Sequence, residues 1–216
     1  MAEGREAVTG EMRSLLEEAA AWRLLGLLFE YPTPAWRAQL EALLADFDEN
    51  EWCNLGEAAL EGASEGAYHE CFGPNGVVCP REAAHSDGIQ LGHLLAELAA
   101  YYQAFGYRPA AGEPDDHIAV EAGFVAYLKM KQAFALVCGD GEHADIAAQA
   151  AAAFLRDHVA VAAHPLAAKL SGRAPEYLAR AARLLAERAG PPPAHPFAAP
   201  AEETGVEDSM LECGAA

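Results

Sequence analysis

The chain has 216 residues, of which 52% are apolar, and its formal net charge is −19. The apolar share excludes disorder of the whole chain, and this length suffices for one hydrophobic core. The charge argues against nucleic acid as a partner and against stable association with an anionic membrane, whereas it would attract a basic peptide.

Helical periodicity extends along most of the chain, with little alternation of the kind that builds sheets. The patterns predict an all-α protein, a helical bundle in which residues 1–189 form a single domain. The Pro-rich acidic segment 190–216 is predicted to be a flexible tail. The predicted helices, in chain order, cover residues 11–30, 34–46, 51–61, 89–105, 114–137, 144–162 and 175–189.

Several residues mark the expected ends of these helices. Thr33 is expected to cap the second helix, with Pro34 at its first position. Gly106 is expected to cap the helix that ends at Phe105. Two breaks are predicted in the second half of the chain, at residues 139–141 and at the His164-Pro165 pair, which occupies residues 164–165.

The cysteines and the amino-terminal residues suggest a compartment. The chain has five cysteines, an odd number, at wide spacing. The first residues are polar and lack the apolar stretch of a secretory signal. No apolar run approaches the roughly 20 residues that a membrane span needs. Together these features predict a cytoplasmic protein with reduced thiols.

Common catalytic signatures are missing, among them the nucleophile elbow, the P-loop and the zinc-protease motif. No cofactor, metal or enzymatic activity is therefore predicted. A long loop at residues 72–88 is bordered by thiols and imidazoles whose spacing matches no common zinc framework. The alternative, a metal-dependent hydrolase, would predict bound metal and turnover, and it would use His69, Cys71, Cys79, His85 and Asp116.

Carboxylates surround a histidine at the start of the fifth predicted helix, where Asp115 and Asp116 precede His117. Glu121 and Phe124 continue the same helix face. The acids would complement the helix dipole from an exposed position. A sharper interpretation is a groove in which such carboxylates accept guanidinium groups in bidentate pairs.

Two blocks of this sequence resemble one protein family. The segment 68–74 resembles the Y-x-x-L-F-x-G-P motif of the TorD/DmsD chaperones, the maturation factors of molybdenum-containing reductases. The segment 79–82 is similar to the P-x-E portion that follows, and residues 113–124 are similar to the signature E-x-P-x-D-H-x-x-x-E-x-x-F, one residue shorter at its start. Departures occur at Cys71, Arg81 and Ala83, where leucine, an aromatic residue and serine are common.

The resemblance implies a TorD-like helical bundle that binds the twin-arginine signal peptide of a molybdopterin-dependent oxidoreductase. It would hold the catalytic subunit of that client for cofactor insertion before export. By the same resemblance, Asp116 and His117 correspond to binding-groove residues, and the loop 68–82 borders the site. The full set of expected signal-binding residues is Asp115, Asp116, His117, Glu121, Phe124, Tyr68, Phe72, Gly73, Pro74, Pro80 and Glu82.

Two alternatives stay open at this point. A nitrate-reductase-type assembly factor would bind its client's mature catalytic subunit or a remnant amino terminus, without recognising an arginine pair. The protein could be a monomer or a domain-swapped dimer, because members of the resembling family can exchange the elements that flank a linker such as residues 107–112.

Overall fold

The computed structural model describes residues 2–45, 47, 51–86, 90–109 and 112–191, with side chains from Gly10 onward. The predicted tail 190–216 lies outside these residues beyond Pro191. The described part is all-α, as predicted, and within it the one β-bridge joins Arg81 to His117. Its helices are α1 Ala2–Leu28, α2 Pro34–Leu44, α3 Glu51–Gly62, α4 Glu65–Phe72, α5 Leu91–Phe105, α6 Ile118–Val137, α7 Gly141–Phe154, α8 Ala160–Leu170 and α9 Glu176–Ala189, with a 3-10 turn η1 at Glu82–Ala84 and a π-turn η2 at Leu155–Val159.

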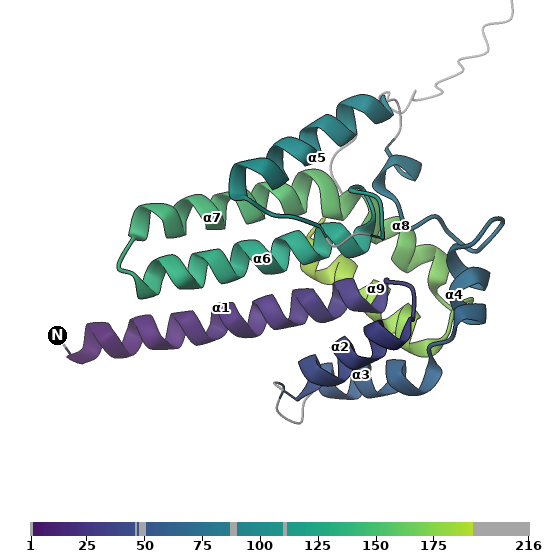
Figure 1. Cartoon of the computed structure of the whole chain (residues 1–216), viewed down its shortest axis with the longest axis horizontal. Helices are drawn as coiled ribbons and strands as arrows, with labels where there is room; N and C mark the ends of the chain where they lie inside the picture. Colours follow the sequence, from purple (N-terminus) through teal and green to yellow (C-terminus); the bar gives the residue numbers. More distant parts are fainter. Residues whose placement is uncertain (1, 46, 48–50, 87–89, 110–111, 192–216) are drawn as a thin grey trace, which may run out of the picture.

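Helices α1, α6 and α7 lie side by side and extend beyond the rest of the molecule (Figure 1). Helices α1 and α6 run antiparallel, since Gly26 faces Ala119 while Lys129 Nζ lies 2.6 Å from a Glu18 carboxylate oxygen. A Cβ at position 26 would lie 2.9 Å from the Ala119 carbonyl oxygen. Glycine therefore permits the two backbones to approach closely at this end.

The hydrophobic core is built around Phe124, which has no exposed surface. Its ring centroid lies 4.7 Å from that of Phe154 and 4.9 Å from that of Tyr102, both in edge-to-face arrangements that favour aromatic pairs. Leu28 and Phe29 at the end of α1 are also buried. Trp36 donates its indole N–H to the Leu27 carbonyl at 2.6 Å, and this bond fixes α2 against α1.

Several predicted helix ends are confirmed. Thr33 accepts the Trp36 amide at 3.1 Å as the cap of α2. Gly106 adopts the left-handed conformation after α5, and Asp140 caps α7 after the predicted break. In the first half of the chain, α1 begins earlier than predicted, at Ala2.

Two further predicted boundaries are wrong. Helix α6 begins at Ile118, not at Pro114, because Asp116 and His117 turn inward before it. Pro165 lies inside α8 and does not interrupt it. The cost of the missing amide bond is offset by burial of Leu166 and Leu170, neither of which has exposed surface.

Candidate functional site

The loop before η1 is fastened to the start of α6 by two backbone hydrogen bonds. The Glu82 amide donates to the Asp116 carbonyl at 2.8 Å, and the Ile118 amide donates to the Pro80 carbonyl at 2.9 Å. These bonds bring together the two sequence blocks that carry the family resemblance. Polar side chains from both blocks meet there with His158 of η2, and we call this set the inner cluster: Arg81, Glu82, Asp116, His117, Glu121 and His158.

Asp116 is the most tightly held member of the inner cluster. Its side chain has no exposed surface, and Arg81 Nη2 lies 2.8 Å from one of its oxygens. The expectation of an exposed acid at a helix start is therefore wrong for this residue. A buried carboxylate requires a partner, and Arg81, at a position where the sequence departs from the family motif, supplies it.

His117 caps α6 with its imidazole ring. Nδ1 accepts the Ala119 amide at 3.2 Å, so Nε2 carries the hydrogen of the neutral ring. That Nε2 lies 3.7 Å from a Glu113 carboxylate oxygen. Burial lowers the pKa of His117 to about 4, against the opposing effect of Asp116. The ring is therefore uncharged at neutral pH, and Glu113 gains no salt bridge from it.

Glu121 and Glu82 place two carboxyl groups in the interior, and both residues are almost fully buried. Burial first, then the proximity of Glu82 and of Asp116, raise the pKa of Glu121 well above its usual range. Both Glu121 oxygens lack a hydrogen-bond partner of good geometry in the described part of the chain. A proton on Glu121 relieves the repulsion from Glu82, whose carboxylate accepts from His158 Nδ1 at 3.2 Å.

The remaining predicted residues are divided between the core and a nearby surface. Phe124 and Pro80 are buried, while Asp115 is half-buried and accepts the Tyr102 hydroxyl through its carbonyl at 2.8 Å. Tyr68 and Phe72 on α4 are half-buried and pack edge to face, with ring centroids 5.1 Å apart. The predicted residues therefore do not form one surface, since Phe124 and Pro80 lie in the interior whereas Tyr68 and Phe72 lie on α4. Gly73 ends α4 by donating its amide to the His69 carbonyl, and the following Pro74 is exposed.

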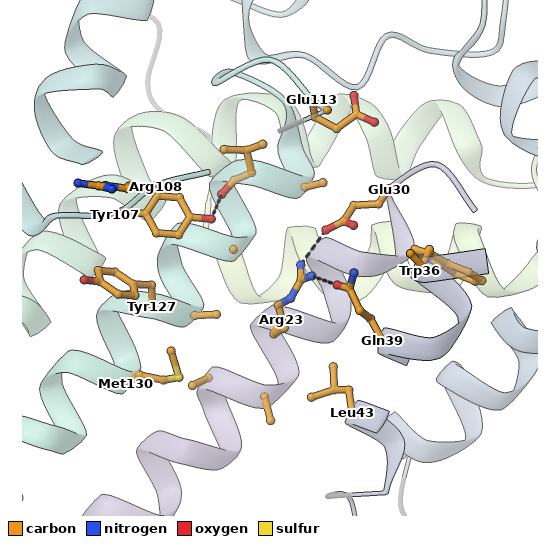
Figure 2. A pocket seen from close by; sticks show the side chains of 18 of the residues that line it. Arg23, Glu30, Trp36, Gln39, Leu43, Tyr107, Arg108, Glu113, Tyr127 and Met130 are labelled. Atoms are coloured by element: carbon orange, nitrogen blue, oxygen red, sulfur yellow. Dashed lines mark hydrogen bonds and ion pairs between the residues drawn. The ribbon is translucent and has the colours of Figure 1, made fainter. Parts of the chain in front are cut away.

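Beside Glu113, whose carboxylate lies 3.7 Å from His117 of the inner cluster, a groove of about 710 Å³ lies between α1, α2, α6 and residues 107–108 and 112–113 (Figure 2). Its floor is made by small residues of α1 and α6. At Gly123 a Cβ would lie 2.7 Å from the Tyr107 hydroxyl oxygen, so a larger residue would collide with the wall. The residues that line it are Leu16, Ala19, Ala20, Arg23, Glu30, Tyr31, Thr33, Ala35, Trp36, Gln39, Leu43, Tyr107, Arg108, Gly112, Glu113, Ala119, Val120, Gly123, Ala126, Tyr127 and Met130.

Charged side chains gather at one end of the groove. Arg23 Nη1 donates to a Glu30 carboxylate oxygen at 2.7 Å, and Nη2 donates to the Gln39 side-chain oxygen at 2.9 Å. Burial, and then the charge of Glu30, raise the pKa of Glu113 above its usual value. Arg108 extends away from both carboxylates (Figure 2). Glu113 is therefore a half-buried acid that lacks a charged partner among the described residues.

Several groove residues were not predicted from the sequence, among them Arg23, Glu30 and Tyr107. Arg23 lies within the apolar stretch that ends α1, and Glu30 follows directly after that stretch. Charged residues inside such a stripe are a signal for a partly buried pair. The pattern did not show that they face Glu113, which is more than eighty residues away in the sequence.

The part of the chain that the structure describes contains no candidate metal site and no candidate membrane-spanning helix. Its His, Cys, Asp and Glu side chains form no group of three or more that could hold a metal ion. Among the same residues, no helix is both long and apolar enough to cross a membrane.

The family described as nitrate reductase delta subunit matches residues 30–167, which is more than half of the chain. The protein belongs to this family. It is a NarJ/TorD-type family, whose members are chaperones for the assembly of molybdenum-containing oxidoreductases. No curated protein and no solved structure matches the chain significantly.

The family match includes both resembling blocks and the groove walls made by α2 and α6. This confirms the family that the motifs at 68–82 and 113–124 indicated. Residues 2–29, and with them the α1 wall of the groove, lie outside the matched range. The matched range therefore contains the α2 and α6 walls of the groove, and α1 supplies a further wall.

Proposed function

We propose that this delta-subunit family member is a cytoplasmic chaperone, without enzymatic activity, that binds the twin-arginine signal peptide of a molybdenum-containing oxidoreductase in the groove. Binding would hold the client's catalytic subunit back until its cofactor is inserted. The observation that carries the proposal is the position of Glu113, a half-buried carboxylate beside Glu30 at the end of an apolar groove.

The charges at this end suit a guanidinium. Glu30 already binds the guanidinium of Arg23 in a charge-assisted hydrogen bond. Glu113 offers a second carboxylate nearby and has no cation of its own among the described residues. A client arginine placed between them would offset both the burial and the repulsion from Glu30 that raise the pKa of Glu113, and each such bond contributes about 1.5–3 kcal/mol.

The rest of the groove suits the apolar part of a signal. Ala19, Ala20 and Ala126 allow close approach of a second backbone, and Tyr31, Tyr127 and other aromatic residues form the walls. Rings of this kind supply large contact area at low entropic cost. A peptide that joins an arginine pair to an apolar segment therefore finds both halves of its complement in one groove.

In this proposal, the predicted residues of the inner cluster do not contact the peptide but hold Glu113 and the start of α6 in position. His117 lies under Glu113, and the bridge between Arg81 and His117 fixes the segment that precedes α6. Asp116, Glu121 and Phe124 are too deeply buried in this conformation to touch a peptide without a rearrangement. We therefore propose that they position the site and that Glu30 and Glu113 contact the client.

Calorimetric titration with synthetic signal peptides from neighbouring oxidoreductase genes tests the function. We expect micromolar or tighter binding, weakened about tenfold or more when both arginines are replaced by lysine. Glu113→Gln should weaken binding of the arginine peptide to a similar extent. Glu61→Gln makes the same charge change on the exposed face of α3 and should leave the affinity unchanged.

A second candidate, the nitrate-reductase-type assembly factor, is favoured by the description of the matching family. Such a protein would bind a remnant amino terminus or the mature catalytic subunit of its client. It predicts equal affinity for arginine and lysine peptides, together with capture of the client's catalytic subunit after its amino-terminal segment is deleted. The titration and this capture experiment therefore separate the two candidates.

A further inference from the structure

An apolar strip continues from the groove along α6 as far as the last residue of that helix, Val137. It consists of Leu16 on α1 and of Met130, Phe134 and Val137 on α6. Phe134 is 70% exposed and Val137 is 60% exposed. Side chains of this size and exposure on adjacent helix turns indicate an interaction surface.

The strip and the groove form one continuous face of α6. Groove residues Val120, Gly123, Tyr127 and Met130 recur at intervals of three and four residues. Phe134 follows Met130 by four positions, which keeps it on the same face. From Val120 to Val137 this face extends roughly 25 Å along the helix.

The two ends of this face differ in charge. The carboxylates of Glu30 and Glu113 lie at the beginning of α6, whereas the end of α6 presents Phe134 and Val137. A twin-arginine signal has the same order, because its arginine pair precedes its apolar segment. Because charge precedes apolar surface in both α6 and the signal, the match fixes the direction in which the peptide would lie along α6.

We propose that the client's signal lies parallel to α6, with its arginine pair at Glu30 and Glu113 and its apolar segment along the strip. This inference rests on the proposed function and adds the orientation and a second contact surface. The strip therefore contributes to affinity only for peptides long enough to reach it.

A synthetic peptide with two adjacent arginines followed by an apolar segment of about 15 residues is a suitable probe. We expect Phe134→Ser and Met130→Ser each to weaken its binding roughly fivefold to tenfold. Leu91→Ser is the matched control, since Leu91 on α5 is 48% exposed, much like Met130 at 49%. It should leave the affinity unchanged.

Shortening the peptide tests the direction. A peptide that lacks the second half of its apolar segment should bind the wild type and Phe134→Ser equally, and it should still respond to Glu113→Gln. A truncated peptide that responds to Phe134→Ser but not to Glu113→Gln would overturn the proposed direction while the signal-binding function stands. No binding of either peptide would overturn the function itself.

The strip could instead be covered by a second copy of the chain. Light scattering at the concentrations of the titration distinguishes this occupant. If Phe134→Ser converts a dimer to a monomer and leaves the affinity for the long peptide unchanged, the strip is a self-interface and the inference is wrong. An unchanged mass together with weakened binding supports it.

Discussion

Arg81 encloses the carboxylate of Asp116 although the two residues are 35 positions apart in the sequence. Arg81 Nε donates to both carboxylate oxygens, at 2.9 and 3.1 Å, and Asp116 accepts a further bond from the Ala83 amide at 3.4 Å. The Arg81 side chain is 36% exposed, while that of Asp116 has no exposed surface. The pair therefore connects a surface loop to the interior.

Loss of Arg81 should destabilise the protein, because it leaves a buried charge without its partner. We expect Arg81→Ala to lower the free energy of unfolding by about 2–4 kcal/mol in urea titrations. The double variant with Asp116→Asn should recover part of this loss. Arg156→Ala removes an exposed ion pair with Asp157 and should change stability by less than about 0.5 kcal/mol. Equal effects of the two arginine variants would contradict this account.

Glu121→Gln should stabilise the protein increasingly as the pH rises. The folded state keeps a proton on Glu121 above pH 4.5, whereas the unfolded state releases it. Because the unfolded state binds fewer protons there, wild-type stability falls with rising pH through this group. Glutamine imitates the neutral acid and removes that dependence.

The measurement for Glu121→Gln is the melting temperature from pH 5 to pH 8. We expect the variant to exceed the wild type most at pH 8, and each kcal/mol corresponds to roughly 2–4 °C for a chain of this size. Melting curves for Glu61→Gln should follow those of the wild type at every pH. A constant difference between Glu121→Gln and the wild type would argue against a buried neutral acid.

His117 should produce the opposite pH dependence. Its pKa falls from 6.5 to about 4 on folding, so between these values the unfolded state binds more protons. Stability from this group is therefore complete above pH 6.5 and is lost, by about 3 kcal/mol, as the pH falls toward 4.

His117→Asn keeps a good helix cap and removes the titrating ring. Urea titrations between pH 7 and pH 4 should show a shallower loss of stability in this variant than in the wild type. His93→Asn, on the exposed surface of α5, should retain the wild-type slope. A wild-type slope in His117→Asn would indicate that the ring is charged in the folded protein.

Arg23 should compete with the client for Glu30. Its guanidinium occupies the carboxylate that a client arginine would use and bridges it to Gln39 on α2. We expect Arg23→Gln to tighten binding of an arginine-bearing signal peptide about threefold to tenfold in calorimetry. Arg183→Gln, on α9, makes the same change in net charge and serves as the control. Equal tightening in both variants would point to net charge alone.

Local signals in the sequence predicted much of the helical architecture. Thr33 with Pro34, and Gly106, acted as helix caps because capping depends on the residues within one turn. The predicted start of α6 was wrong because it depends on a contact with a residue far away in the sequence. Asp116 turns inward to Arg81, and that pairing is not encoded by the residues around Pro114.

The candidate site was predictable in its residue types but not in their exposure. Glu121 and Phe124 were correctly placed on one helix face, yet the pattern did not show that Glu82 and Tyr102 cover them. The groove could not be predicted, because its walls come from α1, α2 and α6 and their distances depend on tertiary packing. The proximity of Glu30 to Glu113 arises only after those helices assemble.

The π-turn η2 between α7 and α8 determines which face of α8 points toward the core. Each residue of an α-helix turns the chain by about 100°, and the wider turn inserts one residue beyond the α-helical repeat. That insertion lets Phe154 point into the core while Leu166 and Leu170 are buried farther along the chain. Deleting one residue from η2 would rotate α8 by about 100° about its axis relative to α7. His158 and the apolar face of α8 would then turn away from the residues they contact.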